Sequence, residues 1–343
     1  MQNLLFPSDP TSAADSSCEA VLFRDLKWVD RSPTVVIEPL LNGQPTGHLH
    51  RVPLHPEGFI GFDTRTDALE QAGLTTNRWC SGYAQALREE TGFRQVPCPE
   101  HATIDKGKQC ARCAARDEFS AMHGIHRGLP LTPAAESYAA LEHWLYIATF
   151  PDGTSKVGTA SALSRPRRLD EQAVACATYV AHAHNGRQVR VLEDMVSAEA
   201  QLVQVKQNAA KYRAWTNPLP APDLKRAHEQ AVSLATWTLQ EAALFEDALD
   251  EEQIISEPWA PSRPMARAYA SLRAEDREPI SAYPTVLDAA HGFHVLGAAG
   301  KFLVAHFGDP DQAFLINTHE LQNRALLPYG RLTEPPQTQD SLF

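Results

Sequence analysis

The sequence of 343 residues contains no apolar run that approaches the ~20 residues a helix needs to cross a membrane. Its first residues lack the positively charged start and the long apolar core of a secretory signal peptide. We therefore expect a cytoplasmic protein that makes no contact with a membrane.

The sequence also shows no internal repeat and no glycine-rich phosphate loop. None of its late glycines precedes a helix that starts with Gly-Lys-Ser, so these glycines predict turns. They are Gly292, Gly297, Gly300 and Gly308.

An excess of positive charge is absent as well. The chain has 31 Lys and Arg against 42 Asp and Glu, a formal net charge of −11, which argues against a protein that coats nucleic acid with its whole surface. Residues 142–213 differ, because nine Lys and Arg against seven Asp and Glu give them a charge of about +2 and leave about −13 on the rest. This segment is compatible with a local basic groove and equally with ordinary arginines on solvated helices.

Cysteine is scarce, with six residues in the chain, but four of them fall between positions 80 and 113. Cys110-Ala-Arg-Cys113 places two thiolates on a tight turn, which is the local geometry that tetrahedral zinc favours. Cys98-Pro-Glu-His101 offers a second knuckle. A cytoplasmic chain of this length argues against a disulfide framework, and no thioredoxin-like βαβ pattern supports a redox pair. The pattern therefore predicts structural zinc.

Three of the zinc ligands are predicted to be Cys98, Cys110 and Cys113, and the fourth is Cys80 or His101. We prefer Cys80, because thiolates suit structural zinc and a Cys₄ site is closed. The remaining candidates are expected to be helix-surface histidines, partners of ligands or ordinary thiols; they are His123, His126, Cys18 and Cys176.

The stretch from Trp144 to Trp215 carries the densest set of local signals. Residues 144–150 form a short apolar, aromatic and β-branched run. Asp152-Gly153 predicts a hairpin turn, and 156–158 would be the returning strand.

Helix-compatible residues follow over 161–185, with a turn at Asn185-Gly186. From Arg187 a helical pattern brings Glu193 and Asp194 between the apolar residues of one face. Those apolar residues are Val189, Leu192, Met195, Val196, Leu202 and Val203.

This order of elements resembles the GIY-YIG nuclease superfamily. Leu145-Tyr146-Ile147 stands at the position of that family's first tripeptide. Lys156-Val157-Gly158 stands at the position of the second, as in the branch whose second motif begins with lysine. Arg168 matches the helix arginine and Glu193 the metal-binding glutamate. The chain departs from the pattern in having lysine for the second tyrosine and no obvious asparagine afterwards.

The resemblance implies a metal-dependent phosphodiesterase, a GIY-YIG-type nuclease acting on nucleic acid. In that role Tyr146 orients or deprotonates the attacking water, and Arg168 holds the phosphate. Glu193 binds one Mg²⁺ or Mn²⁺. Lys156 lowers the pKa of a nearby tyrosine or grips the phosphate as a point charge.

The alternative is a catalytically reduced relative that serves as a zinc-stabilised nucleic-acid-binding module. In that case Tyr146 is a strand aromatic with its hydroxyl at the surface. Glu193 is then paired with Arg190 or Arg187 on its own helix.

A wider pattern extends from residue 80 to 215. It consists of Cys80-Ser-Gly, Cys98-Pro, Cys110-x-x-Cys113, Asp117-x-Phe119, His123, His126-Arg127, Tyr146, Lys156-Val-Gly and Glu171-Gln172. The pattern resembles an uncharacterised bacterial family, domain-of-unknown-function family 2797. The resemblance implies a zinc-binding module joined to a GIY-YIG-like domain, and it brings no established reaction.

We predict an α+β fold for the whole chain. Short β runs and the turn Asn42-Gly43 characterise the start, an amphipathic helix is expected over 223–250, and β runs return from Tyr283. The expected order is a flexible tail (1–16), a small β-rich domain (17–79), a zinc-binding module with a helical connector (80–143), the GIY-YIG-like domain (144–217), a helical segment (218–277), a second small β domain (278–332) and a tail (333–343).

Both ends of the chain carry Gln-x-x-Leu-Phe. The C-terminal copy, with Gln339, Leu342 and Phe343, resembles the peptide by which bacterial DNA-processing proteins dock on the sliding clamp. Such a tail places Leu-Phe in an apolar pocket while the glutamine amide bonds to its rim. We therefore expect DNA rather than RNA as partner, with the clamp as a further partner. A three-position pattern also arises by chance, and the N-terminal copy, Gln2 to Phe6, is equally compatible with a first strand.

Overall fold

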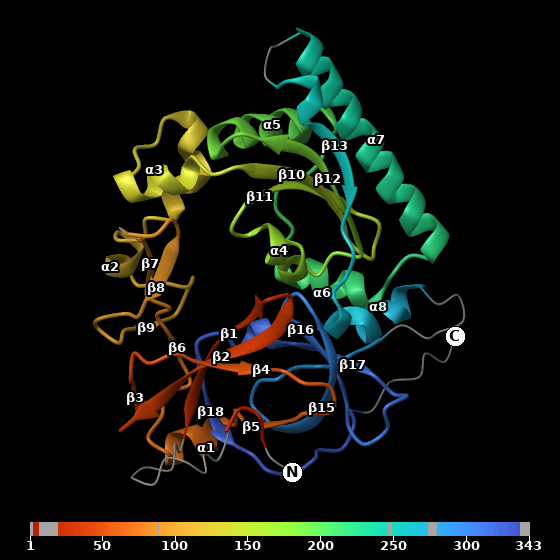
Figure 1. Cartoon of the computed structure of the whole chain (residues 1–343). Helices are drawn as coiled ribbons and strands as arrows, with labels where there is room; N and C mark the ends of the chain where they lie inside the picture. Colours follow the sequence, from red (N-terminus) through yellow and green to blue (C-terminus); the bar gives the residue numbers. More distant parts are fainter. Residues whose placement is uncertain (1–2, 7–19, 88, 246–248, 274–279, 337–343) are drawn as a thin grey trace.

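The computed structural model describes residues 3–6, 20–87, 89–245, 249–273 and 280–336 (Figure 1). It is a mixed α/β fold, as expected, with a large sheet, a smaller α/β unit and a cysteine-rich segment beside them (Figure 1). No helix in these ranges is both long and apolar enough to span a membrane. The C-terminal copy of the clamp-like peptide and Cys18 lie outside the described residues.

Strands from both ends of the chain form the large sheet, in the order β14-β17-β16-β15-β5-β18-β1-β2-β3, with β4 paired to β2. The strands are β1 (Val21–Val29), β2 (Ser32–Leu41), β3 (Gln44–Pro45), β4 (His50–Pro53), β5 (Phe59–Asp63), β14 (Ser281–Ala282), β15 (Ala290–Ala299), β16 (Phe302–His306), β17 (Phe314–Asn317) and β18 (Arg324–Pro328). Helices α1 (Thr66–Gln71) and η5 (Thr318–Leu321) accompany them.

The expected division into two small β domains is therefore replaced by one sheet. β1 pairs with β18, and β5 pairs with both β15 and β18. One apolar core contains Trp28 and Phe62 from the first region and Phe293 and Phe302 from the second. Pairing between strands more than 200 residues apart leaves no local trace in the sequence, which is why the two regions looked separate.

The N-terminal copy of the clamp-like pattern is built into this sheet. Asn3 bridges to Phe59, and its side-chain amide donates to the carbonyl oxygens of Gly61 (2.6 Å) and Tyr329 (3.1 Å). Leu5 is only 1% exposed and belongs to the apolar core. Residues 3–6 are therefore held against the edge of β5 by backbone and side-chain contacts. Gln2 lies outside the described residues.

The cysteine-rich segment connects the large sheet to the central unit along one side of the molecule (Figure 1). It has two small sheets, β6 with β9 and β7 with β8. Its elements are β6 (Arg78–Trp79), β7 (Tyr83–Ala86), β8 (Phe93–Val96), β9 (Thr103–Ile104), α2 (Ala111–Ala114), η1 (Ser120–Arg127) and α3 (Pro133–Ala139).

The central unit has a four-stranded antiparallel sheet in the order β11-β10-β12-β13. Its strands are β10 (His143–Thr149), β11 (Ser155–Ser161), β12 (Cys176–Ala183) and β13 (Ile254–Pro258). The helices around it are α4 (Arg165–Arg168), η2 (Asp170–Gln172), α5 (Gly186–Glu199), α6 (Asn208–Thr216), α7 (Ala221–Phe245), η3 (Glu251–Gln253), η4 (Arg263–Met265) and α8 (Ala266–Arg273).

Alternation along β10 gives the sheet two different faces. Leu145 and Ile147 pack with residues of α5 and α7 in one apolar cluster. Tyr146 and Ala148 belong to a second cluster that includes Leu169, after α4, and Ala214 of α6. The second face therefore looks toward the large sheet, with α4 and α6 between them (Figure 1).

The predicted hairpin is confirmed, since β10 and β11 pair antiparallel around Asp152-Gly153. The helical expectation for 161–185 is only partly right, because α4 and η2 are short and residues 176–183 form β12. Thr178, Tyr179 and Val180 are β-branched or aromatic, and pairing with β10 decides their conformation. β13 joins this sheet from a part of the chain expected to be helical.

One buried ion pair joins the large sheet to the central unit. Asp170 is fully buried, and its two carboxylate oxygens accept from Arg31 Nε (3.0 Å) and a terminal guanidinium nitrogen (2.8 Å). Arg31 lies in the turn between β1 and β2, and the same guanidinium donates to the carbonyl of Ala260 (2.7 Å). Trp259 Nε1 also donates to Asp170 (3.2 Å). This geometry predicts a measurable stability effect.

Arg31→Ala is expected to lower the free energy of unfolding by about 3–5 kcal/mol at neutral pH, because a buried carboxylate is left without its cation. Burial already raises the pKa of Asp170 above its usual value, and Arg31 offsets this only in part. As pH falls through the raised pKa, the variant's carboxyl group takes up a proton. The difference in the free energy of unfolding between the wild type and Arg31→Ala should therefore be smaller in acid than at neutral pH. Urea denaturation at the two pH values measures this difference.

Arg226→Ala is the control, because it removes an exposed ion pair with Asp223 and should cost less than about 1 kcal/mol. Equal stability of the two variants at neutral pH would contradict the role given to Asp170.

Candidate functional site

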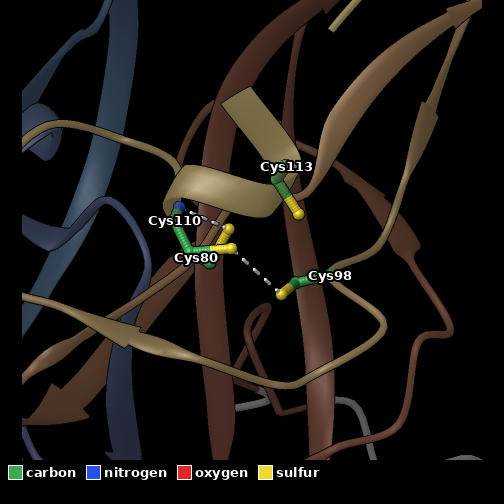
Figure 2. A group of neighbouring side chains, drawn as sticks. All are labelled: Cys80, Cys98, Cys110 and Cys113. Carbon is green, nitrogen blue, oxygen red and sulfur yellow. Dashed lines mark hydrogen bonds between the residues drawn. The ribbon is translucent and has the colours of Figure 1, made fainter. Parts of the chain in front are cut away.

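Four cysteines of the cysteine-rich segment converge (Figure 2). The sulfur atoms of Cys80, Cys98, Cys110 and Cys113 all lie within 4.8 Å of one another, and those of Cys98 and Cys110 are 3.9 Å apart. His101 is not part of the group, so Cys80 occupies the fourth position. These cysteines could hold a metal ion.

The backbone around Cys80 is shaped for this cluster. The backbone N–H groups of Cys110 and Gly82 donate to Cys80 Sγ, at 3.2 and 3.4 Å. Gly82 has a φ of +79°, and a Cβ there would lie 1.9 Å from the carbonyl oxygen of Val96. Only glycine therefore allows this turn to bring its N–H to the sulfur.

The donor set fits a soft, tetrahedral metal ion. Burial raises the pKa of Cys80 and that of Cys113 above the usual value. For Cys110, hydrogen bonds from the Cys113 backbone and the neighbouring thiols outweigh the effect of burial and lower the pKa. The raised pKa values keep Cys80 and Cys113 as thiols unless a cation binds and displaces their protons, and four sulfur ligands are typical of a closed structural zinc site.

Asp117 organises the segment around the cysteines. Its Oδ2 accepts from the backbone N–H of Ala84 (2.9 Å) and from Gln109 Nε2 (2.8 Å), and its Oδ1 accepts from the N–H of Ser120 (3.0 Å). This carboxylate thereby ties β7, the approach to α2 and the start of η1 together. In the sequence Asp117 was noticeable only as part of a family-like pattern.

The two nearby histidines lie away from the thiols. His126 Nε2 is 2.9 Å from Asp194 Oδ2, on α5. For His123, burial and the charges of Arg190 and Arg168 lower the pKa. Both histidines lie outside the group of four thiols, so the structure places neither of them as a ligand.

Protein purified without a chelator is expected to carry about one zinc ion per chain, and Cys113→Ser to lose it, because the thiolates supply all the ligands. Cys176→Ser is the matched control, since Cys176 lies on β12 outside the cluster. Elemental analysis decides the point. Stoichiometric zinc in Cys113→Ser, or none in the wild type, would contradict this assignment.

In the central unit, Tyr146 lies directly against Gly158. The two residues are partners across β10 and β11. A Cβ on Gly158 would approach the Tyr146 Cζ and hydroxyl oxygen to 2.6 Å. The glycine is therefore required because the tyrosine ring occupies the place of a side chain.

Two cations accompany this tyrosine. Lys156, only 5% exposed, has its Nζ 5.6 Å from the centroid of the Tyr146 ring. Arg168 is half-buried, and the phenol raises its pKa. Arg165 points elsewhere, with its guanidinium 4.6 Å from the ring centroid of Trp144. The arginine beside Tyr146 is thus the one that the sequence selected.

The Tyr146 hydroxyl is buried and has no hydrogen-bond partner of normal geometry among the described residues. Burial alone raises the pKa of Tyr146, but the charges of Lys156 and Arg168 outweigh it, so the pKa falls below its usual value. Glu193 opposes this shift through its negative charge, which places it within electrostatic reach of the hydroxyl.

Glu193 is paired on its own helix. Arg190 donates to Glu193 Oε2 at 2.5 Å, and Glu193 is 4% exposed. The structure thus brings the four predicted residues together, but it encloses them. The hydroxyl of Tyr146 does not reach the surface, in contrast to the alternative in which it was an exposed strand aromatic.

A cleft of about 600 Å³ lies beside this enclosed cluster. Arg168 and Arg190 both line this cleft. Arg190 also donates to Glu193, and the charge of Arg168 lowers the pKa of Tyr146, so the two arginines lie between the cleft and the cluster. Its other described lining residues include Phe93, Phe119, His123, Tyr138, His143, Thr159, Ser161, Ser164, Arg167 and Glu171.

Two further lysines that sequence reasoning did not select lie on the same side of the sheet. Burial, followed by the charges of Lys156 and Arg168, lowers the pKa of Lys211 to about 7. The Nζ atoms of Lys206 and Lys211 lie 4.8 and 5.5 Å from the Phe150 ring centroid. Only the excess of basic residues over 142–213 pointed to them.

Gly158→Ala is expected to destabilise the protein by about 1–3 kcal/mol, because the new methyl group overlaps the Tyr146 ring. Gly330→Ala is the control, since nothing lies within 4 Å of a Cβ there. Urea denaturation compares the two, and an unchanged Gly158→Ala midpoint would show that the ring can move away freely.

Comparison with protein-family models, curated proteins and solved structures found no match for this chain. Its function therefore has to be inferred from the two sites themselves, the four-thiol cluster and the enclosed Tyr146 cluster with its cleft.

Proposed function

We propose that this chain is a metal-dependent phosphodiesterase of GIY-YIG type that acts on nucleic acid, built on a structural zinc site. The observation that carries the proposal is the buried hydroxyl of Tyr146, which lies near Lys156 and Arg168, two cations that lower its pKa. A buried ionisable group whose pKa is shifted by specific neighbouring charges favours a chemical role.

The charges around this hydroxyl suit proton transfer. Within the described residues neither Lys156 nor Arg168 forms an ion pair with a carboxylate. Both therefore remain available to stabilise an anion, either the phenolate of Tyr146 or a phosphate. A phenol whose pKa lies below its usual value is a better general base near neutral pH than an ordinary tyrosine.

Glu193 is the residue that would hold Mg²⁺ or Mn²⁺. A carboxylate oxygen is the ligand type these ions prefer, and one protein carboxylate is enough when water and substrate supply the rest. When bound, the ion neutralises the charge that develops on the phosphate. The Arg190 contact would first have to be given up.

The two arginines between the cleft and the cluster offer a way to break the Arg190–Glu193 contact. A phosphate in the cleft would attract both Arg168 and Arg190, because guanidinium groups bind phosphate with paired hydrogen bonds. Drawing Arg190 toward the phosphate would release Glu193. Substrate binding and opening of the metal site would then be one event.

A second function, nucleic-acid binding without cleavage, is favoured by a specific observation. Tyr146 has no exposed surface, and Glu193 already has a partner in Arg190. If these contacts persist when a phosphate is bound, the cleft is a binding site and the cluster behind it is structural.

With Mn²⁺ or Mg²⁺ and mixed DNA and RNA substrates, we expect cleavage that falls about 100-fold or more in Glu193→Gln and Tyr146→Phe. The rate should rise with pH and level off below the ordinary tyrosine pKa of about 10, because the pKa of Tyr146 is lowered. Gel analysis of labelled oligonucleotides measures both effects.

Glu199→Gln is the matched control, because Glu199 lies exposed on the same helix, α5. Cleavage that survives in Glu193→Gln at the wild-type rate would remove the catalytic proposal. Tight binding without any cleavage by the wild type would establish the second function.

A further inference from the structure

The cleft beside the Tyr146 cluster has an aromatic part contributed by the cysteine-rich segment and its connector. Phe93 lies on β8, Phe119 directly precedes η1 and Tyr138 lies on α3. The ring centroid of Phe93 is 5.0 Å from those of both Phe119 and Tyr138. Phe119 is 36% exposed, so this aromatic group is open to a ligand.

A basic part of the same cleft comes from the central unit. Arg167 and Arg168 end α4, and Arg190 lies on α5. Arg167 is engaged by Glu171 and Arg190 by Glu193, whereas no described carboxylate pairs with Arg168. Tyr138 links the two parts, since its hydroxyl lies 2.7 Å from Ser161 Oγ at the end of β11.

We propose that this cleft accepts one unpaired nucleotide of a nucleic-acid strand, with its base against Phe119 and its phosphate at Arg168 and Arg190. The inference rests on the proposed function only in taking a nucleic-acid phosphodiester as the ligand. It adds that the substrate class is single-stranded or unpaired nucleic acid.

Size and chemistry both favour this ligand. A volume of about 600 Å³ lies within the range of small-ligand sites and suits a nucleotide. The bases of a duplex are stacked and paired, so a base must leave the helix before it can meet an aromatic side chain. Stacking on aromatic rings is also insensitive to sequence, because every base has a π face.

The four-thiol cluster would fix the aromatic part in place. Asp117, which holds β7 and η1 together, is separated from Phe119 by one residue, and that residue, Glu118, accepts from the backbone N–H of Ala86 (2.6 Å). By holding β7 and η1 in place, a metal bound at the cysteines would position Phe119 relative to the arginines. This gives the cysteine-rich segment a part in substrate selection as well as in stability.

Fluorescence anisotropy without added divalent cations tests the inference on the full chain. The probes are a labelled mixed-sequence single-stranded DNA, an RNA of the same sequence and the corresponding DNA duplex. We expect tighter binding of one or both single strands than of the duplex, and Phe119→Ala to weaken that binding about 10-fold. The duplex affinity should be unchanged.

Trp237→Ala is the matched control, because it removes an aromatic residue that is 56% exposed on α7, outside the cleft. Phe119→Leu keeps an apolar side chain without a π face, and its zinc content checks that the segment is folded. Loss of affinity in both Phe119 variants with zinc retained supports the inference. Preference for the duplex, or wild-type affinity in both folded variants, would overturn it.

The two proposals fail separately. Selective single-strand binding without cleavage would leave the inference standing while removing the phosphodiesterase. Cleavage of duplex and single strand at equal rates, indifferent to Phe119, would keep the phosphodiesterase and remove the inference.

Discussion

The buried carboxylate of Asp170 is the contact on which the arrangement of the two sheets depends. It joins the β1–β2 turn, through Arg31, to the short η2 helix that directly follows α4. Nearby, Trp215 Nε1 donates to the carbonyl of Ala173 and the Tyr269 hydroxyl to that of Val174, at 2.8 and 2.6 Å. The chain between α4 and β12 is thus held from the large sheet, α6 and α8. Because Arg168 immediately precedes this stretch, its position beside Tyr146 depends on the whole assembly.

Local charge explains how an acidic protein can offer a basic site. The net charge is −11, but Lys156, Arg168 and Lys211 lie close together on one side of the central sheet. Their mutual repulsion, added to burial, lowers the pKa of Lys211 to about 7. Such a concentration of cations is unfavourable for folding unless an anion relieves it. This side of the central sheet therefore carries a local positive charge that the net charge of the chain does not reveal.

The cysteine-rich segment is more than a connector between the sheets. Its four thiols lie close together, and a separate apolar cluster that includes Met122, Ile125 and Ala135 packs within the same segment. The segment also presents Phe93 and Phe119 to a cleft whose basic residues belong to the central unit. Neither part lines the cleft alone.

Local signals in the sequence determined the β10–β11 hairpin, α5, α7 and the cysteine knuckle, because a turn at Asp152-Gly153, an apolar helical period and Cys-x-x-Cys spacing each act within a few residues. The single large sheet, the strand β12 and the choice of Cys80 over His101 were decided only by the tertiary structure. So were the burial of Tyr146 and the aromatic side of the cleft, whereas the pairing of Glu193 with Arg190 is local to one helix and was already an alternative in the sequence. The features that only the tertiary structure decided depend on contacts between residues far apart in the chain, whose free energies no local pattern records.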